Sequence, residues 1–288
     1  MPCCKKCYQA IPSILLIIFI LLTYYSFTHE FCMKGLKEYP TRQLIYLIVE
    51  GIIFFMFAWC FTHVMFCRSN FKIPREFKLN DMEHELLLNL PPLEKSTLLE
   101  QHVQKRRISV WLRTPDNVLR YCMRCHLIKP DRSHHCSACD KCVLKMDHHC
   151  PWTNNCVGFA NHKSFMLMLM YGNLAALFYV IVLIEYYLHI GVIQQDLDTV
   201  ILCSGFLASC IFLLFSWVLY YQHIIWLLRN VTIIETLQDT HFYNPRLTFD
   251  LGKSENFLDV FGECCCFWWI PVNSSYGNGV NFEVRYKR

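Results

Sequence analysis

The 288-residue sequence has little charge for its length. Asp, Glu, Lys and Arg together make up 17% of the chain, whereas a soluble globular domain carries about 25% charged residues. An ordinary cytosolic enzyme is therefore not expected. The net charge is only +4, and this small surplus is widely spread, which excludes a nucleic-acid-binding protein that relies on bulk electrostatics. Hydrophobic residues account for 54% of the chain, and these proportions indicate a membrane protein.

The cysteine content is high but does not indicate a disulfide-stabilised secreted domain. The chain has 18 cysteines, about 6% of its residues, and secreted disulfide scaffolds are both shorter and richer in cysteine, at more than about 8%. The cysteines are therefore expected to have a role other than stabilising a secreted domain through disulfides.

Four stretches are long and apolar enough to cross a bilayer, which takes about 20 mainly apolar residues. They run from about Ile11 to Phe27, from Leu44 to Cys67, from Ser164 to Ile190, and within the uncharged run from Thr199 to Leu228. We therefore predict an α-helical integral membrane protein with four transmembrane helices. The first stretch is too long for a signal peptide and lacks a small-residue cleavage site.

The distribution of basic residues predicts the topology. Residues 68–163 hold 16 of the 27 Lys and Arg residues and the tail after residue 228 holds six, whereas residues 191–198 hold none. The positive-inside rule then puts both termini and the long middle loop in the cytosol. Thiols stay reduced in that compartment, so thiol or metal chemistry is favoured over disulfides.

Two acidic residues interrupt the predicted spans. An acid within a membrane is a functional candidate by default. Glu50 and Glu185 are expected near the luminal ends of their helices, where each would extend to the interface or pair locally. His63 is expected to be an interface residue at the cytosolic end of its span.

A dense cysteine–histidine cluster lies in the middle loop. Seven cysteines and five histidines occur in the stretch from Tyr121 to Cys156. The pattern Cys-x2-Cys-x9-His-x6-Cys occurs twice, starting at residue 122 and again at residue 136, so the two copies interleave. Each copy supplies a full tetrahedral ligand set for structural zinc. The first set is Cys122, Cys125, His135 and Cys142, and the second is Cys136, Cys139, His149 and Cys156.

A buried helical core does not fit this stretch, because lysines and paired histidines interrupt it and no apolar periodicity runs through it. We therefore predict two zinc sites.

One cysteine of the cluster has no predicted metal to bind. The second copy starts 14 residues after the first, and another 14 residues lead from Cys136 to Cys150. A third copy would need ligands at positions 153 and 163, but Thr153 and Lys163 stand there. The alternatives are an idle thiol in a binding module and a catalytic nucleophile.

The residues before Cys150 favour catalysis. In the register of the repeat His148 matches His134, whereas Asp147 replaces Ser133. A histidine can take the proton of a thiol, and a carboxylate can fix the tautomer of the histidine and stabilise its protonated form. A spare thiol beside these two groups is typical of nucleophilic catalysis.

The run Asp-His-His-Cys-Pro-Trp at residues 147–152, with the spaced cysteines before it and two spans on either side, resembles the DHHC family of protein S-acyltransferases, or palmitoyltransferases. The resemblance implies an integral membrane enzyme that takes a fatty acyl group from acyl-CoA onto its own cysteine and passes it to a cysteine of a substrate protein. On that pattern Cys150 is the acylated nucleophile, His148 is its base and Asp147 is the orienting acid. The same pattern implies the two zinc sets found from the repeat.

The resemblance also covers the flanking segments, with departures. Where the family often has Asp-Pro-Gly after the second span, this chain has residues 68–74 of different sequence. The family motif Thr-Thr-x-Glu after the fourth span has Ile233 in place of its second Thr, which leaves Thr232 and Glu235 to cap or tether the catalytic loop. Asn256 is expected to be a structural polar residue of the C-terminal segment.

These observations predict five regions. Residues 1–67 hold the cytosolic N-terminus and two transmembrane helices, 68–120 are a cytosolic linker with a short amphipathic helix on the membrane surface, and 121–163 are the zinc-binding catalytic domain. Residues 164–228 hold the other two transmembrane helices, and 229–288 are a cytosolic C-terminal segment.

An acyltransferase of this kind must keep a long acyl chain out of water, since each methylene is worth about 0.8 kcal/mol in an apolar environment. Cys150 is therefore expected at the membrane surface. Lys129, Arg132 and Lys163 are candidates for the phosphates of CoA, and Trp152 for a further contact with acyl-CoA. Small residues of the third span either leave room for the acyl chain or pack against a neighbouring helix. They are Gly172, Ala175 and Ala176.

The expected partners are the membrane, fatty acyl-CoA and substrate proteins with cysteines near the membrane, and Golgi, endoplasmic reticulum and plasma membrane are all possible locations, with the Golgi favoured. Cysteines beside the membrane are also plausible acylation sites of the chain itself. They are Cys3, Cys4, Cys7 and residues 264–266. The main rival function is a membrane-anchored zinc adaptor without catalysis. A transporter with a regulatory zinc loop is a third alternative, but it would require polar groups at mid-bilayer, and the acidic residues of these spans are expected near the helix ends.

Overall fold

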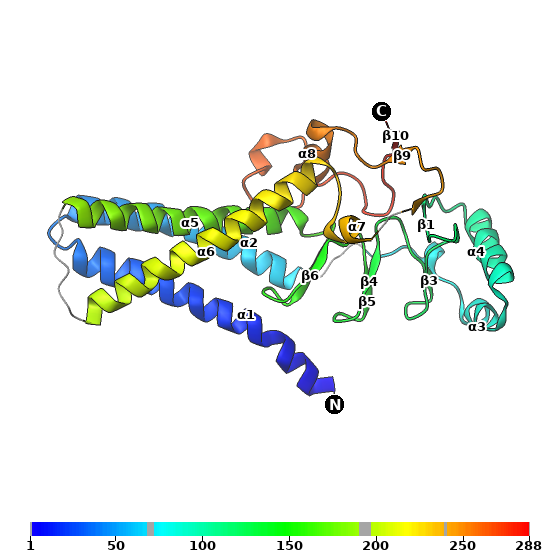
Figure 1. The fold of residues 1–288 in the computed structure, drawn as a ribbon, viewed down its shortest axis with the longest axis horizontal. Coiled ribbons are helices and arrows are strands. Elements are labelled where there is room, and N and C mark those ends of the chain that lie inside the picture. Colours follow the sequence, from blue (N-terminus) through cyan, green and yellow to red (C-terminus); the bar gives the residue numbers. More distant parts are fainter. Residues whose placement is uncertain (1, 68–71, 190–196, 239–240, 288) are drawn as a thin grey trace.

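The computed structural model describes residues 2–67, 72–189, 197–238 and 241–287, with the backbone alone at residues 2–7 and 197. Figure 1 shows a long helical part at one end of the molecule and an irregular part with short strands at the other. The side chains of Cys3, Cys4 and Cys7, which we considered as acylation sites, lie outside the described residues.

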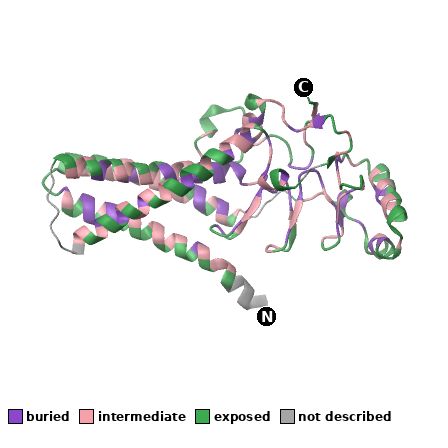
Figure 2. Cartoon of the chain, in the orientation of Figure 1, coloured by how far each residue is buried: buried purple, intermediate pink, exposed green. Residues whose placement is uncertain are grey.

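Four long helical segments confirm the predicted spans. The first is α1 (Pro2–Tyr25), which continues as the π-helix η1 (Ser26–Gly35). The others are α2 (Pro40–Phe66), α5 (His162–His189) and α6 (Leu197–Leu228). Each is long and apolar enough to cross a membrane, so the chain is a multi-pass membrane protein. The outward sides of α1 and α6 carry many exposed residues in Figure 2, as expected for surfaces that face lipid.

The first span is longer than predicted, because η1 continues the helix past Phe27. Glu30 is buried in η1, and its carboxylate forms a 2.7 Å ion pair with Lys34 one turn later. Phe27 and Phe31 are also buried, in a cluster with Tyr179 of α5. The pairing of the charge and the burial of the aromatic rings explain why the helix extends through a polar sequence.

Helix α5 packs against both α2 and α6 in the centre of the bundle. At Gly172 of α5, a Cβ atom would meet Phe57 of α2 at 3.2 Å and Phe212 of α6 at 3.3 Å. Of the two roles considered for the small residues, this contact favours helix packing at Gly172.

The two intramembrane acids differ. Glu185 accepts a 2.6 Å hydrogen bond from Tyr46 and lies 3.3 Å from Arg42, so it pairs locally as predicted. Glu50 was expected to reach the interface or to pair, and this is wrong. Its side chain is buried inside the bundle, and its Oε2 atom has no hydrogen-bond partner among the described residues.

Three short β-hairpins form the cysteine-rich domain. Their strands are β2 (Tyr121–Cys122) with β3 (Leu127–Ile128), β4 (His134–Cys136) with β5 (Lys141–Val143), and β6 (His148–Cys150) with β7 (Asn155–Val157). Each hairpin turn contains one residue with a positive φ angle, at His126 (51°), Asp140 (49°) and Asn154 (47°). These three positions are separated by the same number of residues as the copies of the sequence repeat. The repeat therefore corresponds to one hairpin that occurs three times.

The segment before the hairpins differs from the prediction. It forms η2 (Arg75–Phe77), α3 (Asp81–Asn89) and α4 (Pro92–Arg106). We expected a short helix on the membrane surface, but Figure 1 shows α3 and α4 at the end of the molecule away from the membrane helices. Leu87 and Leu99 are buried there with Ile128 and Leu144 of the cysteine-rich domain. The apolar side of this segment therefore covers the hairpins.

The C-terminal segment folds back over the junction between the two parts. It contains α7 (Ile233–Leu237), α8 (Lys253–Phe261) and η3 (Cys265–Phe267). Two small sheets include its strands: β8 (His241–Phe242) pairs with β1 (Leu112–Arg113) from the segment before the hairpins, and β9 (Leu247–Thr248) pairs with β10 (Arg285–Tyr286). Asn256 of α8 donates to the carbonyl oxygen of Leu228 at 2.8 Å, so it caps the end of α6 as a structural polar residue.

Candidate active site

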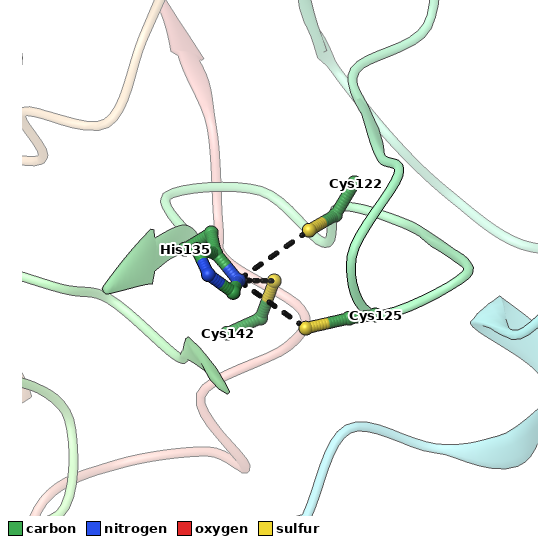
Figure 3. Close-up of side chains that lie close together, drawn as sticks. All are labelled: Cys122, Cys125, His135 and Cys142. Carbon is green, nitrogen blue, oxygen red and sulfur yellow. Dashed lines mark hydrogen bonds between the residues drawn. The ribbon is translucent and has the colours of Figure 1, made fainter. Parts of the chain in front are cut away.

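The first predicted zinc set converges in space (Figure 3). The Nδ1 atom of His135 lies 3.6 Å from the sulfur of Cys122, 3.3 Å from that of Cys125 and 4.0 Å from that of Cys142. Zinc bonds of about 2.0–2.3 Å arranged tetrahedrally separate the ligand atoms by roughly 3.5–3.8 Å. The four side chains therefore fit a structural zinc ion.

The second set has the same geometry. The Nδ1 atom of His149 lies 3.5 Å from the sulfur of Cys139 and 3.6 Å from those of Cys136 and Cys156. The sulfurs of Cys139 and Cys156 are 3.4 Å apart. Three sulfurs and one nitrogen with no open ligand position are typical of a structural rather than a catalytic zinc site.

Cys150 occupies the corresponding position in the third hairpin. It pairs with Asn155 across β6 and β7, in the same register as Cys122 with Leu127 and Cys136 with Lys141. It belongs to neither ligand cluster. Thr153 stands where the other two hairpins have their second cysteine, and it is fully buried. The turn of the third hairpin thus has the shape of a zinc-binding turn, but Cys150 is its one thiol, because Thr153 replaces the second cysteine.

Asp147 and His148 lie beside this thiol. The Nδ1 atom of His148 is 2.6 Å from Oδ2 of Asp147. The other carboxylate oxygen of Asp147 accepts a 2.8 Å hydrogen bond from the backbone N–H of Ile233 in α7. The family motif at position 233 therefore acts here through the backbone rather than through a hydroxyl, which explains how the departure at Ile233 is tolerated.

The surroundings shift the three pKa values in complementary directions. Burial lowers the pKa of His148, but its hydrogen bonds to Asp147 and Cys150 outweigh burial and raise the pKa to about 9. Burial raises the pKa of Asp147, yet its hydrogen bond to His148 and the nearby His223 ring hold it below its ordinary value. Burial also raises the pKa of the Cys150 thiol, and the contacts with His148 and Thr153 reverse this effect and lower it. Together the shifts favour a thiolate beside a protonated imidazole.

His134, the counterpart of His148 in the repeat, has the opposite environment. It lies 3.3 Å from a guanidinium nitrogen of Arg120 instead of beside a carboxylate. Burial and the positive charge of Arg120 lower its pKa to about 3. The same hairpin position therefore holds a neutral histidine in the second hairpin and a basic one in the third, because Asp147 replaces Ser133.

His223, the only histidine of the uncharged run 199–228, was not predicted to lie near the site. It is buried in α6, and its Nδ1 atom donates to the carbonyl oxygen of Leu219 at 2.8 Å. Its Nε2 atom faces Oδ2 of Asp147 at 3.6 Å, and its ring meets that of His148 edge-on at 5.9 Å between centroids. A polar residue in an apolar span was a signal for this role.

Arg132 is fully buried and fully paired, which argues against the predicted contact with CoA phosphates. Its guanidinium donates two hydrogen bonds of 2.8 Å to the carboxylate of Glu235 and others to Asn230. Glu235 in turn caps α7 through the backbone N–H of Thr232 at 2.9 Å. The predicted tether is thus present, and Arg132 is its partner.

We expect Arg132→Met to destabilise the protein by about 3–5 kcal/mol, because it leaves the buried Glu235 carboxylate without its partner. Thermal unfolding of the purified protein in detergent measures the effect. Arg124→Met is the matched control: Arg124 lies 3.8 Å from Asp140 with both side chains exposed, where a pair contributes at most about 1 kcal/mol. Equal shifts for the two variants would contradict a structural role of the Arg132–Glu235 pair.

Lys163 also has structural partners. Its amino group donates to the carbonyl oxygens of Phe267 at 2.5 Å and Val272 at 3.0 Å and to the hydroxyl of Ser274 at 2.8 Å. These bonds fasten the C-terminal segment to the start of α5, and they leave the Lys163 ammonium no donor for a CoA phosphate.

The other two predicted contacts remain accessible. Lys129 lines a surface pocket of about 230 Å³ together with Arg113, Arg120, His134 and His241. Trp152 is 53% exposed at the tip of the third hairpin. The neighbouring carbonyl oxygen of Pro151 accepts a 3.1 Å hydrogen bond from Ser13 of α1. The hairpin tip that follows Cys150 therefore touches a membrane helix.

Comparison with known proteins agrees with this geometry. A family model described as DHHC palmitoyltransferase matches residues 116–240. Palmitoyltransferase ZDHHC15 of Rattus norvegicus is 33% identical over 297 residues, which cover 98% of this chain and 84% of the relative. Palmitoyltransferase ZDHHC20-A of Danio rerio is 36% identical over 293 residues, covering 98% and 80%. Palmitoyltransferase ZDHHC2 of Danio rerio is 33% identical over 287 residues, covering 98% and 78%. The chain belongs to the DHHC palmitoyltransferase family.

Proposed function

We propose that this protein is a protein S-acyltransferase that moves a long-chain fatty acyl group, such as palmitoyl, from acyl-CoA to cysteines of other proteins through a thioester on Cys150. The observation that carries the proposal is the third hairpin, in which the one thiol outside both metal clusters lies beside an Asp147–His148 pair. The names of the similar proteins support the same activity.

In the first half-reaction the Cys150 thiolate attacks the thioester carbon of acyl-CoA. The bond from that carbon to the CoA sulfur breaks, and the CoA thiolate leaves with the proton that His148 took from Cys150. In the second half-reaction the thiolate of a substrate cysteine attacks the Cys150 thioester, and Cys150 is released. Asp147 keeps the His148 imidazole oriented through its 2.6 Å hydrogen bond, and His223 supports Asp147 from α6.

The position of Cys150 suits an acyl chain that lies within the membrane. Cys150 is buried in an apolar cluster with Phe61 of α2, Phe165 of α5 and Leu227 of α6. A palmitoyl chain that leaves the thioester can extend among these helices without entering water, at about 0.8 kcal/mol for each methylene. Substrate cysteines must then approach at the membrane surface, so we propose membrane-anchored or membrane-associated substrate proteins.

We propose two zinc ions as the structural metals, one in each four-ligand set. When bound, zinc holds its thiolate ligands and closes the loop. His149, a ligand of the second set, immediately precedes Cys150, so the second set fixes the backbone on which the nucleophile stands. Both termini and this site are proposed to face the cytosol, where CoA thioesters are available, and the Golgi is the favoured location.

A burst experiment tests the proposed function. Purified protein mixed with palmitoyl-CoA, without an acceptor, is expected to release about one equivalent of CoA per chain and then stop or slow, because the acyl group stays on the enzyme. Mass spectrometry should place a hydroxylamine-sensitive acyl group on Cys150, and a peptide acceptor should restore turnover. CoA release that requires the acceptor from the outset would contradict the covalent intermediate, and a zinc adaptor would give no burst.

We propose that the Lys129 pocket receives phosphates of CoA, because Lys129, Arg113 and Arg120 line it and, among the described residues, no acidic side chain does. Lys129→Glu is expected to raise the KM for palmitoyl-CoA by a factor on the order of ten, as for the loss of one charged contact, while burst amplitude at saturating donor stays near one equivalent. Lys95→Glu, which changes a half-buried lysine of α4 outside this pocket, is the control. An unchanged KM in the Lys129 variant would exclude this pocket as the CoA site.

A further inference from the structure

Three adjacent cysteines, Cys264–Cys266, stand between α8 and the aromatic residues that follow. All three side chains are exposed. The large apolar side chains of Phe267 and Trp269 beside them are 44% and 60% exposed. Exposed aromatic residues in a membrane protein are typical of a segment at the membrane interface.

The segment is fastened at the level where α5 enters the membrane. Lys163, in the first turn of α5, donates to the carbonyl oxygen of Phe267 at 2.5 Å, and Tyr171 donates to that of Trp269 at 2.8 Å. The rise from Lys163 to Tyr171 is about 12 Å along the helix. The aromatic residues therefore lie alongside the first turns of a membrane span, and the cysteines precede them directly.

The same segment packs against the apolar cluster that contains Cys150. Cys150 belongs to an apolar cluster that includes Val260 and Phe261 at the end of α8, and Trp268 packs against this cluster. Trp268 also donates to the carbonyl oxygen of Gly262 at 2.8 Å. The three cysteines thus lie on a loop whose two ends, Phe261 and Trp268, both contact the cluster that surrounds Cys150.

We infer that Cys264–Cys266 are S-acylation sites of this protein and receive their acyl groups from Cys150; the inference rests on the proposed function. The sulfur of one of these cysteines, as the thiolate, attacks the carbonyl carbon of the Cys150 thioester. A new carbon–sulfur bond forms, the bond to Cys150 breaks, and the Cys150 sulfur leaves as a thiolate beside His148, which has accepted the proton released by the attacking thiol. Palmitoyl-CoA supplies the acyl group, and no oxidant or reductant takes part. The attached chain inserts beside Phe267 and Trp269 and anchors the C-terminal segment in the bilayer.

Labelling of the purified full-length protein tests the inference. Wild type, Cys150→Ser and a triple variant with Cys264→Ser, Cys265→Ser and Cys266→Ser are reconstituted in lipid nanodiscs and incubated with alkyne-labelled palmitoyl-CoA. Peptide mapping should find hydroxylamine-sensitive label on residues 264–266 and on Cys150 in wild type. The label on residues 264–266 should fall at least tenfold in Cys150→Ser. Cys203 serves as the internal control and should stay unlabelled. It is an exposed cysteine near the N-terminal end of α6, whereas the C-terminal segment follows the other end of that helix.

The triple variant separates this inference from the proposed function, since it tests transfer from Cys150 to an acceptor peptide alone. Label on Cys150 and on the acceptor but none on residues 264–266 of wild type would overturn the inference and leave the acyltransferase intact. Equal label on residues 264–266 in wild type and Cys150→Ser would overturn it also, because acylation would then be independent of Cys150. Wild type that takes up no label on Cys150 and transfers none to the acceptor peptide would overturn the proposed function.

Discussion

Replacement of Cys150 by serine is expected to remove the acyl–enzyme adduct and to lower acyl transfer by a factor on the order of 10³ or more. The serine hydroxyl loses its proton far less readily than the thiol, so the contacts with His148 and Thr153 that lower the pKa of Cys150 cannot produce a comparable nucleophile. Transfer of labelled palmitate to an acceptor peptide measures the loss. The serine is nearly isosteric, and the fold should remain.

Two controls make this result specific. Cys67→Ser changes a half-buried cysteine at the end of α2 that belongs to neither metal cluster, and we expect it to keep its transfer activity. Metal analysis of Cys150→Ser should still find two zinc ions per chain. Transfer at the wild-type rate by Cys150→Ser would show that another residue carries the acyl group, whereas loss of zinc would show that Cys150 is a ligand.

The second large effect is expected at the metal sites. Cys139→Ala removes one sulfur of the second set and should lower the zinc content from two ions per chain to one. Apparent binding free energies for structural zinc in small domains are about 10–16 kcal/mol. This loss is comparable to the whole stability of an ordinary domain, about 5–15 kcal/mol, so the third hairpin should lose its order and the burst of CoA release should disappear.

Cys125→Ala, the matching change in the first set, provides the comparison. It stands in the same position of the first hairpin, one repeat unit away from Cys139 in the chain. We expect it to lose one zinc ion and to unfold the first hairpin, while the second set still closes around Cys150. Inductively coupled plasma mass spectrometry gives the zinc content, and limited proteolysis shows which hairpin has opened. Full zinc content in either variant would contradict the ligand assignment.

The parts of the structure that were predictable from sequence are those with a local, repeated signal. A membrane span is a continuous apolar run, so its position can be read without knowledge of its neighbours. The metal sets obey a fixed spacing between Cys122 and Cys156, and the repeat distinguishes Cys150 from the ligands. The spacing is informative because the geometry of a hairpin determines which residues of a short segment lie close together.

The remainder depends on contacts between distant segments. His223 lies in the last membrane helix, far along the chain from Asp147, and Glu235 is still more remote from Arg132. Arg132 and Lys163 were predicted to bind the phosphates of CoA, but the packing of the C-terminal segment buries and pairs them. Helices α3 and α4 were misplaced for the same reason: an amphipathic pattern shows that a face is buried but not whether lipid or protein covers it.

The place of the nucleophile within the second ligand set has a consequence for maturation. Cys150 lies between His149 and Cys156, so the chain that carries it is held in place only after the last ligand of that set has been engaged. A newly made chain that has not yet acquired its metal would present a thiol without an ordered base, and it could not be charged with lipid. If the proposed function holds, zinc would have to bind before the first acyl transfer could take place.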